Sequence, residues 1–226
     1  MNRLLSLAVL GLAAVSADAA SMSFTLEAPG QLTTTAFLPG ETLVETFGSE
    51  TPGTPFGPAV RPIGTYSAGA VVSPANDWGF STYLAMGAQS GTKMYQLTFN
   101  EDQDYFGLYW AALDGRNELQ FWNDGSLVAS FGRNEFLASP DMTGAHFGKP
   151  GTGINMGEAY AFVNFFADDA ASRFDMVRFV NGGTDTGFET DNHTIRSMSG
   201  GQVPEPSTYV MAGVALAAGL AWKRRK

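Results

Sequence analysis

The chain has 226 residues, no cysteine and a formal net charge of −9 at pH 7. The lack of cysteine excludes disulfides, thiol catalysis and cysteine-based metal sites. Five of the 13 basic residues lie at the two ends, so residues 20–206 carry 8 Lys and Arg against 21 Asp and Glu, a net charge of −13. So acidic a body lacks the basic footprint that nucleic acid requires, and we expect no nucleic-acid partner.

The N-terminus has the three parts of a secretory signal peptide. Arg3 supplies a positive charge, Leu4–Ala14 is an apolar run, and Ala17 and Ala19 flank Asp18 in a small-x-small cleavage site. We therefore expect residues 1–19 to form a signal helix that signal peptidase removes. The mature chain then begins near Ala20.

The first part of the mature chain predicts few strands. Ser21–Glu27, Leu32–Phe37 and Glu41–Phe47 are rich in aromatic and β-branched residues. Gly48–Pro74 is rich in glycine and proline, which excludes a central strand from its Thr-Pro-Gly-Thr-Pro segment. We predict a long surface loop there, with one short strand at Thr65–Val72.

The strand pattern is clearest from Lys93 onward. Lys93–Phe99 and Asn117–Trp122 alternate apolar and polar residues, whereas Tyr105–Leu113 is apolar on both faces. Asp114-Gly115 and Asn123-Asp124-Gly125 predict turns, because these residues tolerate positive φ. With Ser126–Phe131 as the returning strand, the segment predicts a meander of consecutive antiparallel strands.

A second long loop is expected over residues 138–158, where glycine and proline recur. Tyr160–Phe166, Arg173–Val180 and Gly187–Ile195 then predict the last strands. Nine to eleven antiparallel strands favour a two-sheet β-sandwich, jelly-roll-like, over residues 20–196. Residues 197–202 form a short polar linker.

Several segments of the second half also resemble a family of exosortase-dependent surface proteins with a β-sandwich body. The resemblance covers about residues 93–196 and supports fold and location rather than a chemical activity. In this family the domain commonly ends in Phe-Glu-hydrophobic-Asp-Asn, and here Thr190 takes the hydrophobic place. The segments that carry it are Tyr105–Trp110, Asn117–Trp122, Val163–Phe166, Phe174–Phe179 and Gly187–Asn192.

No catalytic motif is recognisable, and we expect a protein that is not an enzyme. The sequence contains no Gly-x-Ser-x-Gly elbow, and its two histidines, His146 and His193, are far apart. We interpret His193 as a surface residue of an edge strand. The separation of the two histidines also argues against a zinc or copper site.

Calcium is the one metal that the acidic residues suggest. Glu101, Asp102 and Asp104 follow one another closely in a predicted turn between two strands, and carboxylates are calcium ligands. Asp168-Asp169 and Asp191-Asn192 are lesser candidates. A solvated acidic turn remains the alternative, since no EF-hand spacing occurs.

A carbohydrate-contacting surface is suggested by Trp122 and Glu118. Glu118 and Gln120 share one face of a predicted strand, and Trp122 follows on the same face, where its ring could stack on a sugar. Glu189 and Asp191 also share a face. Such carboxylates leave a glycosidase open as the alternative to a lectin-like binding module.

The C-terminus reads as a sorting signal. Val203, Pro204, Glu205 and Pro206 open an extended segment that runs through residue 208, since proline fixes φ and lacks an N–H. Tyr209–Trp222 is an uncharged run for which we expect a short transmembrane helix of roughly 21 Å, less than the roughly 30 Å of a bilayer core. The chain ends in a basic stop, which places this end in the cytoplasm. The stop consists of Lys223, Arg224, Arg225 and Lys226.

This tail resembles the PEP-CTERM sorting signal of bacterial surface proteins over residues 203–226. The resemblance implies an exosortase as processing partner, cleavage near Pro-Glu-Pro, and delivery to the cell surface or extracellular matrix. An ordinary single-pass anchor is the alternative. We therefore expect an exported protein with a structural or adhesive role, with exopolysaccharide as its candidate partner and no required cofactor.

Overall fold

The computed structural model describes residues 21–36, 41–74, 82–150 and 153–197. The predicted signal peptide and sorting tail, and the linker beyond Ser197, lie outside the described residues. In the part that is described, no helix is both long and apolar enough to cross a membrane.

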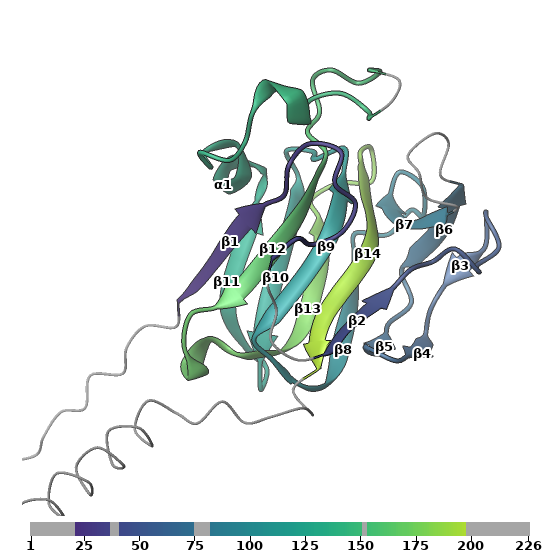
Figure 1. The fold of residues 1–226 in the computed structure, drawn as a ribbon. Coiled ribbons are helices and arrows are strands. Elements are labelled where there is room, and N and C mark those ends of the chain that lie inside the picture. Colours follow the sequence, from purple (N-terminus) through teal and green to yellow (C-terminus); the bar gives the residue numbers. More distant parts are fainter. Residues whose placement is uncertain (1–20, 37–40, 75–81, 151–152, 198–226) are drawn as a thin grey trace, which may run out of the picture.

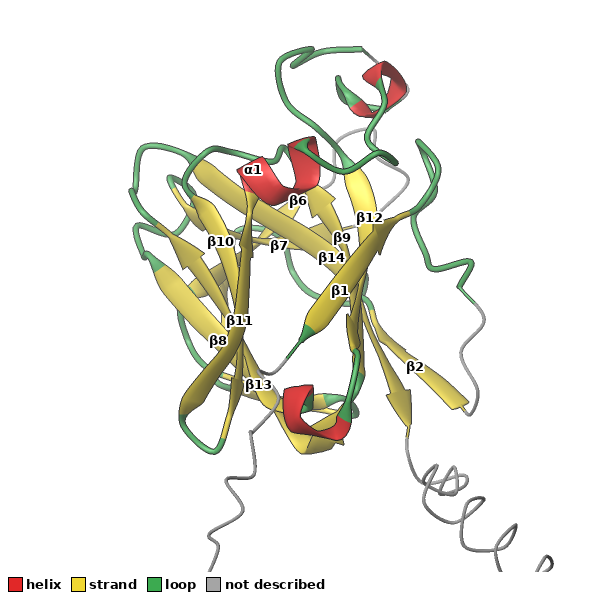
Figure 2. Cartoon of the chain, turned by 90° about the vertical axis from the view of Figure 1, so that its left-hand side faces the viewer, coloured by secondary structure: helices red, strands yellow, loops and turns green. Residues whose placement is uncertain are grey.

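Two antiparallel sheets face each other, as Figure 2 shows edge-on. In the eight-stranded sheet the strands run in the order β1 (Met22–Leu26), β12 (Ala161–Ala167), β9 (Tyr105–Ala111), β14 (Gly187–Ser197), β7 (Thr82–Gly87), β6 (Ala70–Pro74) and β3 (Pro55–Phe56), while β2 (Glu41–Glu45) also pairs with β14. In the six-stranded sheet the order is β11 (Ser126–Gly132), β10 (Asn117–Asn123), β13 (Phe174–Asn181), β8 (Met94–Gln103), β5 (Gly64–Tyr66) and β4 (Ala59–Arg61). The predicted two-sheet, mostly β architecture is therefore confirmed.

Aromatic rings fill the space between the sheets. Phe121 of β10 reaches across to Phe165 of β12, with ring centroids 4.9 Å apart. Trp110 and Phe188, on the adjacent strands β9 and β14, stack at 4.6 Å. These rings are fully buried, and the area they remove from water is the main favourable contribution to folding.

The short helix α1 (Arg133–Leu137) follows β11 and lies over one end of the sandwich (Figures 1 and 2). It inserts Phe136 between the sheets, where this ring meets Phe24 of β1 at 5.0 Å and Trp110 of β9 at 5.1 Å. Two 3₁₀ turns occur at Gly144–His146 and Ala170–Ser172. Neither α1 nor these turns has a helical sequence period long enough to be predicted.

The predicted hairpin at Asn123-Asp124-Gly125 is confirmed. Asn123 pairs with Ser126 across a two-residue loop, and Asp124 and Gly125 have φ values of 48° and 76°. Positive φ at both loop positions is the geometry that matches the twist of the flanking strands. The hairpin thereby fixes the register of β10 and β11.

Several other predictions are wrong. The predicted strand at residues 32–37 is irregular over residues 32–36. The predicted loop Gly48–Pro74 contains four strands, β3 to β6, and its proline-bearing β3 lies at the edge of its sheet, where a missing N–H is tolerated. The described residues form 14 strands rather than nine to eleven.

The predicted meander does not form either. The strands β8 and β10 belong to the six-stranded sheet, whereas β9 between them belongs to the other. The chain therefore crosses from sheet to sheet and back. The central position of β9, between β12 and β14, agrees with its prediction as a strand that is apolar on both faces.

Candidate functional site

The three polar side chains predicted on one face of β10 do lie together on the outer face of the six-stranded sheet. Leu119 and Phe121 point into the core, so the alternating positions point outward. The Gln120 amide nitrogen donates to Glu118 at 2.9 Å, and the Trp122 indole N–H donates to the Gln120 oxygen at 3.2 Å. We call this hydrogen-bonded row of three the β10 ladder.

Arg178 covers part of the ladder. It lies opposite Gln120 on β13, and its guanidinium carbon sits 4.4 Å from the centre of the Trp122 ring. A cation in this position is attracted by the ring's electron-rich face. One face of the indole is thus shared with Arg178, and a sugar ring would stack on the other face or displace the guanidinium.

A cleft of about 600 Å³ opens at the Glu118 end of the ladder. Its walls come from the β9–β10 connection, β10, β11 and the first residues of α1. The polar and charged side chains that line it are Arg116, Asn117, Glu118, Ser130, Arg133, Asn134 and Glu135. This volume falls within the usual range for small-molecule pockets, although the lining here is more polar than is common.

Apolar side chains continue the same outer face across the sheet. The strand registers place one row of six residues side by side, which at about 4.8 Å per strand spans roughly 24 Å. In order the row is Leu127, Trp122, Met176, Thr98, Thr65 and Val60. Leu127 and Val60 are exposed, and so is Met94 on β8, two rows away beyond Gln96.

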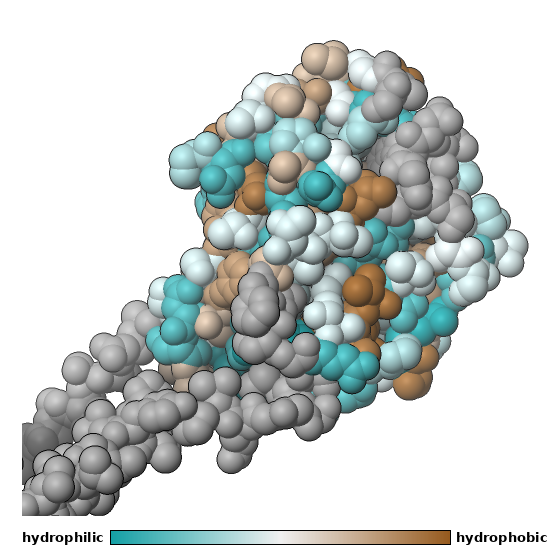
Figure 3. Space-filling model, in the orientation of Figure 1, coloured by the Kyte–Doolittle hydropathy of each residue, from teal (hydrophilic) through white to brown (hydrophobic). Residues whose placement is uncertain are grey.

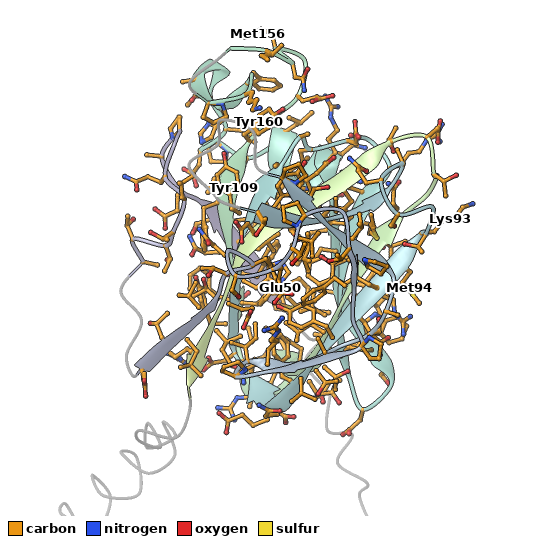
Figure 4. The ribbon with its side chains drawn as sticks, turned by 90° about the vertical axis from the view of Figure 1, so that its right-hand side faces the viewer. Glu50, Lys93, Met94, Tyr109, Met156 and Tyr160 are labelled. Atoms are coloured by element: carbon orange, nitrogen blue, oxygen red, sulfur yellow. The ribbon has the colours of Figure 1, made fainter. Side chains whose placement is uncertain are left out.

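Figure 4 shows Met94 and Lys93 on the opposite side of the sandwich from Tyr109 and Tyr160. The latter two belong to a small buried cluster on the outer face of the eight-stranded sheet. Figure 3 views that sheet's side of the molecule, where hydrophobic patches are interrupted by hydrophilic residues. Met94 is therefore accessible on the outer face of the six-stranded sheet, whereas Tyr109 and Tyr160 are buried on the outer face of the eight-stranded sheet.

The three carboxylates predicted to bind calcium are not brought together as one ligand set. Glu101 and Asp102 lie at the irregular, exposed end of β8 rather than in a turn. The Asp104 carboxylate forms an ion pair with Arg196 of β14 through Oδ2, while its Oδ1 atom is buried without a hydrogen-bond partner among the described residues. Over the described ranges, no group of three or more His, Asp or Glu side chains is arranged to hold a metal ion.

Glu189 and Asp191 do share the outer face of β14, as predicted, but both are buried. Glu189 lies opposite Ala85 and Ala111, and Asp191 opposite Tyr109. Burial raises the pKa of Glu189 to about 8 and that of Asp191 to about 7. Glu189 accepts a hydrogen bond from Gln89, while its Oε2 atom has no hydrogen-bond partner among the described residues.

The prediction of a surface position for His193 is wrong. It lies on β14 in the centre of the core, where the Tyr66 hydroxyl contacts Nδ1 at 2.8 Å and the Thr190 hydroxyl contacts Nε2 at 2.9 Å. Burial lowers its pKa to about 3, so the ring is neutral at pH 7. His146 is also buried, with Nε2 3.0 Å from the backbone oxygen of Glu27. Both histidines serve packing, and neither faces the cleft.

Sequence reasoning missed Arg133 and Arg178. Neither residue lies near Trp122 or Glu118 in the sequence, and only the pairing of β10 with β11 and β13 brings them close. The sequence offers one signal for them, which is that residues 20–206 contain only eight basic residues. Each of these few basic residues is therefore a candidate for a binding site.

Comparison with known families tests whether the C-terminal segment is the predicted sorting signal. Residues 202–226 match the PEP-CTERM protein-sorting motif. The chain carries a PEP-CTERM signal. This confirms the predicted resemblance and identifies an exported protein that an exosortase processes and that is sorted through the membrane to the cell surface.

Comparisons over the remaining chain are uninformative about activity. No curated protein matches the chain. The catalytic domain of a GH87 alpha-1,3-glucanase variant in complex with tetrasaccharides is similar at 17% identity, with a TM-score of 0.31, over 83% of this chain and 30% of that one. The enzymatically active domain of bacteriophage CBA120 tailspike protein 4 is similar at 16% identity, with a TM-score of 0.26, over 61% and 18%. The chain thus spans less than a third of either structure, and at these TM-scores neither likeness bears on fold or function.

Proposed function

We propose that this PEP-CTERM protein is a surface adhesin that binds polysaccharide through the outer face of its six-stranded sheet. The observation that carries the proposal is the β10 ladder, which runs from the partly exposed Trp122 into a polar cleft. Sugars present apolar ring faces together with hydroxyl groups, so an aromatic side chain beside amide and carboxylate groups suits them. The exported location places this face where extracellular glycans occur.

The proposal is binding without turnover. Glycoside hydrolysis uses two carboxylates on either side of the scissile bond. On β10 the outward neighbours of Glu118 are an amide and an indole, not a second carboxylate. Glu135, the other carboxylate of the cleft, accepts the backbone N–H of Gly132 at 2.9 Å and so begins helix α1. Its role in the helix start accounts for it without catalysis.

Binding of the secreted domain to exopolysaccharide purified from the producing cells tests the proposal. We expect Trp122→Ala to weaken binding about tenfold, since a lost aromatic contact costs about 1.4 kcal/mol. Phe166→Ala is the matched control. Phe166 is a partly exposed aromatic residue of β12, and it lies opposite Ser23 at the outer face of the other sheet.

Three outcomes count against the proposal. Equal loss of binding in the Phe166→Ala control would mean that the two sheets are not distinguished, and no binding by the wild type would remove the function altogether. Release of labelled sugar that disappears in Glu118→Gln would replace binding with hydrolysis. Melting temperatures of all variants separate these results from unfolding.

A further inference from the structure

Basic side chains gather around the β10 ladder although the protein as a whole is acidic. Arg116 and Arg133 line the cleft, and Arg178 lies over Trp122. They are three of the eight basic residues in a body of net charge −13. Elsewhere Arg61 and Arg196 are each paired with a carboxylate and so have a structural explanation.

Arg133 and Arg178 differ from those paired arginines. Within the described ranges neither has a carboxylate within ion-pairing distance, whereas Arg116 pairs with Asp185. Arg133 donates from Nε to the backbone oxygen of Leu113 at 3.2 Å, which fixes its guanidinium and leaves the terminal nitrogens uncommitted. The Nε atom of Arg178 is buried with no hydrogen-bond partner in the described part of the chain.

Arg133 lies at the Glu118 end of the ladder, and Arg178 lies beside its middle residue. Arg133 directly follows Gly132, which pairs with Glu118, and Arg178 pairs with Gln120. Glu118 and Gln120 are two residues apart on one strand, so these two rows are separated by about 7 Å. Two arginines without a described carboxylate in ion-pairing distance thus lie near this row of hydrogen-bonding groups.

The lining carboxylates of the cleft form no ion pair with these arginines, and Asp114 of the β9–β10 connection interacts with Arg133 without forming a close ion pair. Glu118 accepts its hydrogen bond from the Gln120 amide, and Glu135 accepts from a backbone N–H. Both bonds come from neutral donors. A ligand that brings its own carboxylates would supply the missing partners, because a guanidinium presents two parallel N–H groups that match a carboxylate.

We propose that the polysaccharide bound here is acidic, a polymer whose sugar units carry carboxylate groups, with Arg133 as the residue that selects for it. This inference rests on the proposed function and adds the ligand class. In it, the sugar ring packs against Trp122 while carboxylates of the polymer bind Arg133 and Arg178. Because the protein's net charge repels polyanions at long range, recognition depends on these local contacts and falls with added salt.

The test compares two polymers that differ only in the carboxylate. Polygalacturonate is one probe, and its carboxyl-reduced, neutral form is the other. We expect the wild type to prefer the charged polymer at least tenfold at low salt. Arg133→Gln should remove most of that preference, because it should weaken binding of the charged polymer much more than binding of the neutral one.

Two further variants keep the test specific. Arg173→Gln removes a cation beside the opposite end of β13 and should leave the preference intact. Arg133→Lys retains the charge without the two-pronged geometry and should restore the preference only in part. A variant that failed to fold would lose the neutral polymer as well, so the two probes report unfolding separately.

The outcomes divide clearly. Equal affinity of the wild type for both polymers, or an unchanged preference in Arg133→Gln, would overturn the inference and leave polysaccharide binding standing. Absence of binding to both polymers and to the producer's own exopolysaccharide would overturn the proposed function with it. If Arg173→Gln removed the preference for the charged polymer as fully as Arg133→Gln does, the preference would depend only on overall charge. That result would also overturn the role of Arg133.

Discussion

At the scale of single residues, Thr190 is the most instructive position. Its side chain is buried, and its hydroxyl contacts both the Tyr95 hydroxyl and His193 Nε2 at 2.9 Å. The Tyr66 hydroxyl contacts the other imidazole nitrogen, Nδ1, and completes this row of hydrogen bonds. The hydroxyl serves a buried hydrogen-bond network that a hydrophobic side chain at this position could not join.

Thr190→Val should therefore destabilise the protein, although valine matches threonine in shape and is more hydrophobic. The substitution leaves the Tyr95 hydroxyl and one imidazole nitrogen buried without this partner. An unsatisfied buried polar group costs about 1–3 kcal/mol. We expect the free energy of unfolding to fall by about 2 kcal/mol in urea titrations.

The control for this prediction is Thr65→Val, the same chemical change at an exposed position of β5. It should alter stability by less than about 0.5 kcal/mol. Should Thr190→Val be as stable as the wild type, the network would contribute nothing beyond packing.

At the scale of elements, the hairpin between β10 and β11 fixes the proposed binding face. Gly125 has a φ of 76° and open space around its α-carbon, so backbone conformation alone restricts the residue type. Gly125→Val should cost about 1–2 kcal/mol of stability, because a β-branched residue is strained at positive φ. It should also weaken polysaccharide binding, since the loop aligns Trp122 with Leu127.

Thermal unfolding with and without polysaccharide measures both effects. Gly144→Ala is the matched control, because that glycine also has open space around it but does not have positive φ. Its melting temperature should stay close to that of the wild type. An equal loss of stability in both variants would show that glycine content rather than turn geometry matters.

The sequence predicts elements well where the pattern is local and poorly where it is not. The two-residue turn after Asn123 and the burial of β9 on both faces follow from residues within a few positions of one another. The sheet to which β9 belongs depends on its pairing with β12 and β14, which come from the far end of the chain. No short-range period encodes that choice, and the meander prediction fails for this reason.

The candidate site divides in the same way. The period of two along β10 predicts that Glu118 and Trp122 share a face, and they do. Arg178 joins them only through the β10–β13 register, and Arg133 only through the cleft beside α1. The acidic segment at Glu101 shows the opposite error, since proximity in sequence there suggests a metal site and Asp104 instead pairs with a distant arginine.

At the scale of the whole molecule, three buried titratable groups make stability depend on pH. Glu189 and Asp191 have folded-state pKa values of about 8 and 7, above their ordinary values of 4.5 and 3.8, because burial disfavours their charge. Between these two pKa values each carboxyl group stays protonated in the folded chain but loses its proton in the unfolded chain. The stability that each group contributes is therefore fully present below its unfolded-state pKa and is lost as pH rises through its folded-state pKa.

His193 acts in the opposite direction over a lower range. Its folded-state pKa of about 3 lies below the ordinary 6.5, so the unfolded chain binds the additional proton between these values. Stability from this group rises with pH up to about 6.5. Between pH 5 and 6.5 two carboxyls oppose one histidine, which leaves a net loss of about 1.4 kcal/mol per pH unit as pH rises.

Glu189→Gln isolates one of these groups. Glu189 is only 6% exposed, so solvent screens its charge little. In the variant, Asp191 and His193 cancel between pH 5 and 6.5, and the free energy of unfolding should be nearly constant there, whereas the wild type declines. Urea titrations at half-unit pH steps measure both slopes. A wild-type protein whose stability rises steadily from pH 5 to 6.5 would mean that Glu189 and Asp191 are ionised in the folded state and that water reaches them, which would make the outer face of β14 an open surface rather than a buried one.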